Sequence, residues 1–119
     1  MLFRSLMGQT KFRLLILDEA QEDTKDLRRD ILKNFSTQTW KQTSAELGLT
    51  FGNIRQFPQS GYVPTELSDF GGLNFREVLS GQNRVIYEVR DDTIYIHVVT
   101  DTRRDLQTLL QKRLLRSRW

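Results

Sequence analysis

The segment 75–105 constrains the fold of this chain more than any other, because it has the pattern of three consecutive strands. Apolar side chains recur at every second position through 83–89 and again through 93–99, which is the spacing of half-buried strands. Turn-forming residues separate the strands at 80–83, Ser-Gly-Gln-Asn, and at 90–92, Arg-Asp-Asp. Such turns between alternating runs predict an antiparallel meander.

The residues before the meander predict one strand and two helices. The compact apolar run 12–17 is typical of a first strand that is buried on both faces. Asp18 is expected to cap a helix that ends at Asn34, with apolar residues at helical spacing on one side. Ser36 or Thr37 then begins a second helix, which the first can meet as an antiparallel helix hairpin.

These elements together predict an α+β fold. A strand and two helices with apolar stripes can bury those stripes only against a sheet face. We expect the helix hairpin, residues 19–56, to pack on a small four-stranded, mainly antiparallel sheet whose strands lie near 12–17, 73–79, 83–89 and 93–99. A basic helix from about Arg103, with leucines along one side, completes the domain.

Length and composition indicate one small domain, assigned to residues 12–119, after an N-terminal extension of residues 1–11. A chain with 38% hydrophobic and 28% charged residues is typical of a soluble globular protein. The extension lacks the features of a signal peptide. No apolar run approaches the roughly 20 residues of a membrane span, so we expect a cytoplasmic protein without membrane contact.

The sequence offers little for metal, nucleotide or triad chemistry. His97 is the only histidine and cysteine is absent, so neither a metal site nor a cofactor is expected. Walker A, Gly-x-Gly-x-x-Gly and Gly-x-Ser-x-Gly motifs are absent as well. Carboxylates of the first helix lie three or four residues from basic residues, which favours exposed ion pairs over an acid–base pair.

Cationic side chains give the strongest functional signal. One group of arginines lies at or beside the strand ends, and a second basic group follows in the C-terminal helix: Arg76, Arg84, Arg103 and Arg104, then Lys112, Arg113, Arg116 and Arg118. Metal-free RNA cleavage needs cations that stabilise phosphate charge and groups that move protons. Among the strand residues Tyr87 or His97 would serve as the latter. Alternatively, Tyr87 belongs to the core and the basic helix is a solvated face.

Four segments, in order and spacing, resemble the RelE/ParE superfamily of bacterial toxins from type II toxin–antitoxin systems. They are LILDEAQEDTKDLRRDI (15–31), IRQFP (54–58), NRVIYEVRDDTIYIHVV (83–99) and TRRD (102–105). The usual Tyr-Arg of the strand becomes Asn83-Arg84, and Thr102 replaces the glycine of the terminal turn. The resemblance covers about residues 12 to 105. It implies the fold above and a toxin that arrests growth, with a role in plasmid stabilisation.

The resemblance leaves two targets open. RelE-like members cut messenger RNA on the ribosome with a set of arginines and a terminal tyrosine or histidine. Arg103 or Arg104 matches one of those arginines, whereas Leu79 and Leu110 occupy two other catalytic positions, and neither leucine can move a proton. ParE-like members share the fold, lack the nuclease set and poison DNA gyrase, so the resemblance favours the ParE branch.

Each hypothesis names its own residues. A nuclease would use catalytic residues from the set Arg84, Tyr87, His97, Arg103 and Arg104. A gyrase inhibitor would contact its target through cations from the set Arg76, Arg84, Arg104, Lys112, Arg113 and Arg116. A non-catalytic nucleic-acid-binding domain that uses the basic tail is a third hypothesis.

The expected partner is a small cognate antitoxin with an otherwise disordered segment that wraps the toxin. Its acidic residues would meet the basic excess of this chain, which has a net charge of +3, and its apolar anchors would dock beside the helix hairpin. Such a partner allows a hetero-oligomer of toxin and antitoxin.

Overall fold

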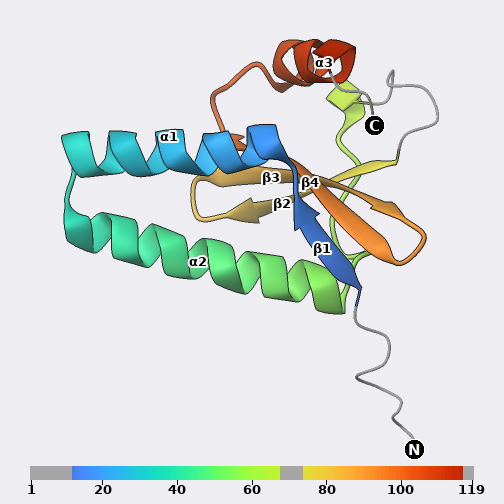
Figure 1. The fold of residues 1–119 in the computed structure, drawn as a ribbon, viewed down its shortest axis with the longest axis horizontal. Helices are drawn as coiled ribbons and strands as arrows, with labels where there is room; N and C mark the ends of the chain where they lie inside the picture. The colour runs from blue at the N-terminus through green and yellow to red at the C-terminus, as the bar shows by residue number, and fades with distance from the viewer. Residues whose placement is uncertain (1–11, 68–73, 117–119) are drawn as a thin grey trace, which may run out of the picture.

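The computed structural model describes residues 12–67 and 74–116 (Figure 1). Its elements in chain order are β1 (Arg13–Ile16), α1 (Asp18–Asn34), α2 (Thr37–Gln56), the 3-10 helix η2 (Thr65–Leu67), β2 (Phe75–Ser80), β3 (Asn83–Arg90), β4 (Thr93–Asp101) and α3 (Leu106–Arg116). This confirms the predicted α+β fold with a helix hairpin and a C-terminal helix. The proposed extension 1–11, residue 73 and Arg118 lie outside the described residues. Among the described helices, none combines the length and hydropathy that a membrane span requires.

The sheet has the strand order β1-β4-β3-β2 and is mainly antiparallel, as predicted. β3 pairs antiparallel with both β2 and β4, and β1 pairs parallel with β4. Gly81 (φ 59°) and Asp91 (φ 54°) begin the two tight turns of the meander. Glycine reaches this left-handed region without strain and aspartate tolerates it, so these turns hold the strands in register.

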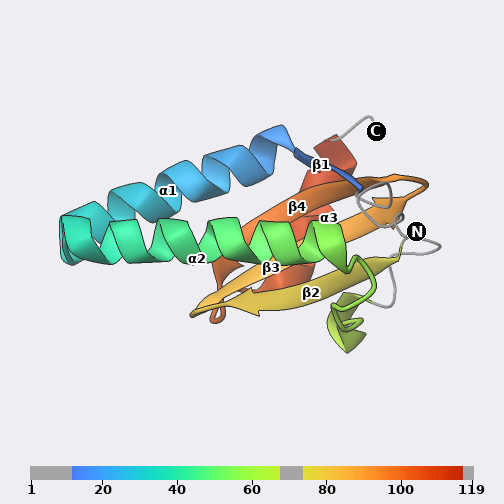
Figure 2. The same cartoon turned by 90° about the horizontal axis from the view of Figure 1, so that it is seen from below.

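Each face of the sheet carries its own hydrophobic core, and Figure 2 shows the helix hairpin and α3 on opposite sides of the sheet. On the hairpin side the buried residues are Ala20, Leu47, Ile54, Val85, Tyr87, Ile94, Ile96 and Val99. On the other side α3 and η2 cover a second core of Leu67, Phe75, Ile86, Val98, Leu106 and Leu110. The sheet is therefore buried on both faces over its two central strands.

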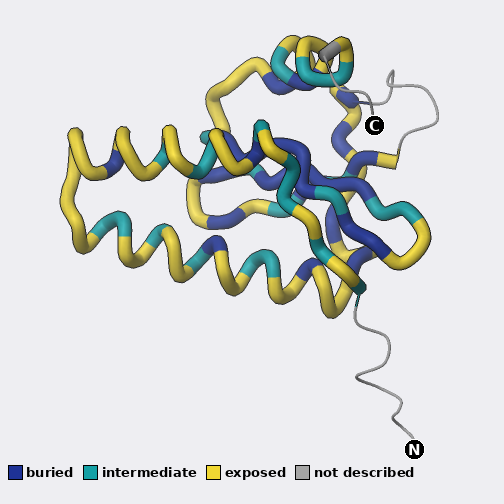
Figure 3. Tube along the Cα trace, viewed as in Figure 1, coloured by how far each residue is buried: buried dark blue, intermediate teal, exposed yellow. Residues whose placement is uncertain are grey.

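The prediction that the first strand is buried on both faces is wrong. β1 is an edge strand in which exposed and half-buried residues alternate (Figure 3). Leu14 and Ile16 pack against the hairpin core, whereas the side chain of Leu15 is 43% exposed. The helices cover only one face of β1, because β4 and not β1 occupies the centre of the sheet.

The start of α2 and the end of α1 at Asn34 agree with the prediction, whereas the starts of α1 and α3 differ. The hydroxyl of Ser36 caps α2 by accepting a hydrogen bond from the Thr39 N–H at 3.0 Å. Leu17, not Asp18, is the residue before α1, and no side chain caps that end. α3 begins at Leu106 instead of Arg103, because the carboxylate of Asp105 accepts from the N–H and the hydroxyl of Thr108.

β4 contains one residue more than its partner strand. Ile86 lies opposite Val98 and Tyr87 lies opposite Ile96, so His97 has no counterpart in β3. This is the geometry of a β-bulge. The extra residue turns His97 and Val98 away from the helix hairpin and returns Val99 to the hairpin core.

Candidate functional site

Tyr87 is a buried core residue whose hydroxyl group is fully engaged. The hydroxyl donates a hydrogen bond to the carbonyl of Pro58 at 2.8 Å and accepts one from the N–H of Gly61 at 3.0 Å. Burial raises the pKa of Tyr87 above its ordinary value. A phenol that stays protonated and has no access to solvent cannot act as a base toward a bound RNA.

His97 is also buried, but on the opposite face of the sheet. Its Nε2 lies 3.1 Å from a carboxylate oxygen of Glu88, which is equally buried, and its ring meets Phe75 edge-on with centroids 5.0 Å apart. The ring therefore belongs to the α3 side of the molecule, whereas the ring of Tyr87 belongs to the hairpin core. The sheet separates the two groups that the nuclease hypothesis requires.

Arg84 forms a largely buried ion-pair network. Its guanidinium binds both carboxylate oxygens of Glu77, at 2.6 and 2.8 Å, and also pairs with Glu66 of η2. The hydrogen bonds to Glu77 are the main reason that the pKa of Arg84 is raised. This arginine therefore binds Glu77 of the neighbouring strand and fastens η2 to the sheet.

The remaining expected cations do not form one cluster. Arg76 donates from Nη1 to the carbonyls of Gly61, at 2.8 Å, and Gln59, at 3.3 Å. Arg103 is exposed and pairs with Asp101 at 3.2 Å. Arg104 and Lys112 are exposed, and the charge of Arg104 is one of the weaker causes that lower the pKa of Asp101. The side chain of Arg116 lies outside the described part of the structure.

Arg113 holds α3 to α1 around the edge of the sheet. Its guanidinium binds both carboxylate oxygens of Asp23, at 2.5 and 2.7 Å, and both side chains are only 12% exposed. It also donates to the carbonyl of His97 at 2.8 Å, while Asp23 accepts from the N–H of Val99 at 2.9 Å. We call this four-residue arrangement the Asp23–Arg113 clasp. It gives Arg113 an internal role that the sequence did not indicate.

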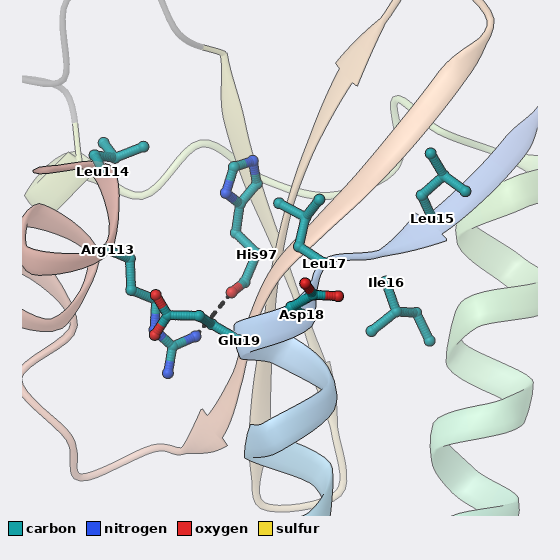
Figure 4. Close-up of a pocket in the computed structure, with 8 residues that line it drawn as sticks. All are labelled: Leu15, Ile16, Leu17, Asp18, Glu19, His97, Arg113 and Leu114. Carbon is teal, nitrogen blue, oxygen red and sulfur yellow. Dashed lines mark hydrogen bonds and ion pairs between the residues drawn. The ribbon is translucent and has the colours of Figure 1, made fainter. Parts of the chain in front are cut away.

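A pocket of about 480 Å³ lies beside the clasp, between the end of β1, the start of α1 and α3 (Figure 4). Its lining combines apolar side chains with two carboxylates: Leu15, Ile16, Leu17, Asp18, Glu19, His97, Arg113 and Leu114. Asp18 and Glu19 stand at the uncapped start of α1, and Arg113 Nε is 3.6 Å from Glu19. The volume is within the range of pockets that hold a small molecule or a few side chains.

The predicted catalytic residues are thus dispersed. Tyr87 and His97 lie in opposite cores, Arg84 is paired on the η2 side, and Arg103 and Arg104 are exposed at the end of β4. Over residues 12–67 and 74–116, no group of three or more metal-ligating side chains is placed to hold an ion. The described residues contain no convergent set for phosphoryl chemistry.

Comparisons with known proteins add the family. A model of the ParE toxin of type II toxin–antitoxin systems, parDE, matches residues 14–106. The chain is similar in fold to a chain of the chromosomal ParDE TA system from P. aeruginosa, at a TM-score of 0.61 and 11% identity, over 77% of this chain and 97% of that one. A copper-bound mutant toxin from Helicobacter pylori gives a TM-score of 0.48 at 17% identity, over 76% and 94% of the two chains, which is too low to support an assignment. No curated protein matches the chain.

The family match and the fold agree on the same region. The matched residues run from β1 to the first residue of α3, and thus contain the helix hairpin and the whole sheet. Most of α3 lies after the matched region, including Arg113 and Leu114, which line the pocket. The match confirms the resemblance to the ParE branch, and the chain belongs to the ParE toxin family of type II toxin–antitoxin systems.

Proposed function

We propose that this toxin acts by binding and inhibiting DNA gyrase, without a chemical step of its own. The observation that carries the proposal is the separation of Tyr87 and His97, which are buried on opposite faces of one sheet. RNA cleavage requires two proton-transfer groups and a cation at one phosphate. Neither ring can reach a substrate that Arg84 or Arg104 would hold.

The two leucines at the expected catalytic positions support the same proposal. Leu79 lies on β2 with an exposed side chain, and Leu110 is fully buried in the core beneath α3. An aliphatic side chain at either position offers no proton and no charge. A toxin with this surface is better suited to blocking a protein than to cleaving a phosphodiester.

Of the cations proposed to contact the target, Arg104 and Lys112 are the best available. Both side chains are exposed to solvent. Arg84 and Arg113 are held by Glu77 and Asp23 instead, so their contribution is to the fold. An exposed cation steers association with an acidic surface at a low desolvation cost.

One pair of assays tests the proposal. Purified toxin is added to DNA gyrase, ATP and relaxed plasmid, and in parallel to translating ribosomes with a defined messenger. We expect supercoiling to be blocked, with or without accumulation of cleaved plasmid, and the messenger to remain intact. Site-specific cuts in the messenger with normal supercoiling would refute the proposal and establish the ribosome-dependent nuclease.

We further propose that a cognate antitoxin neutralises the toxin by docking at the pocket beside β1. Leu15 is a large apolar side chain exposed on an edge strand, and it lines a pocket with two other leucines. An edge strand beside an apolar hollow suits an extended peptide segment with an apolar anchor.

Co-expression tests this docking. The open reading frame adjacent to the toxin gene is expected to relieve growth arrest by the natural toxin. Leu15→Asp should leave the toxin active but weaken its neutralisation, since a charge would enter the apolar contact. Leu115→Asp places the same charge on an exposed leucine of α3 outside the pocket lining and serves as the matched control. Equal neutralisation of both variants would refute this docking site.

A further inference from the structure

The segment 57–64, between α2 and η2, is a loop whose backbone is fastened to the sheet. The Tyr87 hydroxyl binds it at two points, the Pro58 carbonyl and the Gly61 N–H. Arg76 donates to the Gly61 carbonyl from the neighbouring strand. Tyr62 exchanges two backbone hydrogen bonds with Glu77 of β2, at 2.8 and 3.1 Å. We call this segment the 57–64 loop.

Close packing at Gly61 keeps the loop in place. A Cβ atom at this position would lie 2.6 Å from the Tyr87 hydroxyl oxygen and 3.0 Å from the Glu77 carbonyl oxygen. Both distances are shorter than a normal contact, so only glycine allows the loop to approach the sheet this closely. Pro58 and Pro64 are buried at the two ends of the loop. The backbone is therefore held in one conformation by hydrogen bonds and by packing.

This fixed backbone holds three large apolar side chains in solvent. Phe57 is 60% exposed, Tyr62 is 55% exposed and Val63 is 58% exposed. Single exposed apolar residues are common on protein surfaces, but here three of them lie within seven positions of one tied segment. Aromatic side chains are enriched among the residues that contribute most to protein interfaces. A preorganised anchor also loses less conformational entropy on binding.

The charges around the loop indicate what its partner carries. Arg55 precedes the loop and is exposed, and Arg76 lies beneath it. Among the described residues, two carboxylates lie nearby, Glu66 and Glu77, and both pair with Arg84. Three arginines therefore meet two carboxylates, which leaves a net charge of +1 beside the loop. This positive charge favours a partner surface with carboxylates beside an apolar hollow.

We propose that the 57–64 loop is the surface through which this toxin holds its folded protein target. The inference rests on the proposed function, and it adds apolar anchors to the exposed cations named there. A short rigid loop suits a preformed hollow on a folded protein better than a disordered segment that wraps a large area. The loop lies along β2, at the opposite edge of the sheet from β1, so it is separate from the antitoxin pocket.

Replacement of the anchors tests the proposal in the gyrase supercoiling assay. The double variant Phe57→Ser/Val63→Ser removes two anchors and leaves the loop hydrogen bonds intact. Phe35→Ser/Leu49→Ser is the matched control, because it also removes one aromatic and one aliphatic side chain, 73% and 70% exposed, from the helix hairpin away from the loop and from α3. We expect the loop variant to need at least tenfold more protein for half-inhibition, and the control to remain within twofold of the natural toxin. Circular dichroism melting of both variants verifies that they are folded.

Charge reversal provides an independent arm of the same experiment. Arg55→Glu places a negative charge beside the loop, whereas Lys41→Glu places one about 21 Å away on the same helix, at 1.5 Å per residue. Only the first is expected to weaken inhibition, and the loss should diminish with added salt. Equal potency of Arg55→Glu and Lys41→Glu would show that positive charge beside the loop does not contribute to target binding, and would overturn this part of the proposal.

The outcomes separate this inference from the proposed function. Inhibition of gyrase by the loop variant at the potency of the natural toxin overturns the inference and leaves the proposed function standing. If the natural toxin does not inhibit gyrase, the proposed function fails, and growth arrest in cells becomes the measurement. Full arrest by the loop variant then overturns the inference, whereas arrest by the control alone supports a different protein target at the same loop.

Discussion

The Asp23–Arg113 clasp makes a quantitative prediction about the stability of the toxin. Replacing Asp23 by Leu leaves the guanidinium of Arg113 without its bidentate partner and the N–H of Val99 without an acceptor. Because both clasp side chains are only 12% exposed, water can replace few of the hydrogen bonds that the substitution removes. We expect the substitution to destabilise the fold without altering either hydrophobic core.

The magnitude follows from two contributions. Removing one partner of a buried ion pair costs about 3 to 5 kcal/mol, and the residual exposure here places this pair at about 3 kcal/mol. Loss of the acceptor for the Val99 N–H adds about 1 kcal/mol. The free energy of unfolding should therefore fall by about 3 to 4 kcal/mol, a large part of the roughly 5 to 15 kcal/mol available to a small domain.

Urea unfolding followed by circular dichroism measures this change. With an m-value of about 2 kcal/mol/M, Asp23→Leu should lower the unfolding midpoint by about 1.5 to 2 M. The double variant Asp23→Leu/Arg113→Met removes both charges and should lose less than Asp23→Leu alone, since no buried charge is then left unpaired. The double-mutant cycle should give a coupling of about 2 kcal/mol or more.

Asp26→Leu is the control, because Asp26 lies on the same helix in an ion pair with Arg29 whose two side chains are more than 60% exposed. Exposed pairs contribute about 0 to 1 kcal/mol, so its midpoint should change little. Equal midpoints for Asp23→Leu and Asp26→Leu, or strict additivity in the cycle, would refute the clasp as a stabilising contact.

Three further predictions concern single residues. Tyr87→Phe should cost about 1 to 2 kcal/mol of stability in urea unfolding, since the buried Gly61 N–H loses its acceptor; a folded variant without any toxicity would instead give the hydroxyl a chemical role. A hydrogen bond from the backbone N–H of Arg103 is the main reason that the pKa of Asp101 is lowered. The stabilisation that Asp101 provides is therefore complete above about pH 4, and it is lost as the pH falls through the lowered pKa. Asp101→Asn should therefore lose less stability than the natural toxin when melting is followed from pH 5 to pH 2. Arg104→Ala should weaken gyrase inhibition severalfold at low salt without changing the melting temperature. Unchanged inhibition would show that Arg104 does not contact the target.

The sheet and the helix hairpin could be predicted because their signals are local. The alternation through 83–89 and 93–99, with turn residues between the runs, is contained in short windows of sequence. The start of α2 was equally accessible, since it depends on a hydrogen bond between Ser36 and Thr39, whereas the uncapped start of α1 was not. The burial of β1 was not, because a short apolar run does not reveal whether a strand lies at the centre or at the edge of a sheet.

The candidate site was harder to predict because its contacts are distant in sequence. Asp23 and Arg113 are 90 residues apart, and each alone resembles an ordinary solvated charge on a helix. Arg84 was recognised as important, but its partner Glu77 lies on the neighbouring strand, where only the register of β2 on β3 identifies it. The pocket beside β1 depends on where α3 packs against the rest of the fold. The spacing of apolar residues along the sequence does not specify that position.

The extra residue in β4 has a consequence for how this fold tolerates change. Ile94 and Ile96 face the helix hairpin before the bulge, Val99 faces it again afterwards, and Val98 faces α3. If the strand alternated regularly through residue 97, every side chain after it would exchange one core for the other. The bulge prevents this, because His97 and Val98 lie in succession on the α3 side and the alternation then resumes at Val99. Deletion of residue 97 would therefore leave a regular strand with both cores in place, whereas an inserted residue that no second bulge absorbed would exchange the cores for all side chains beyond it.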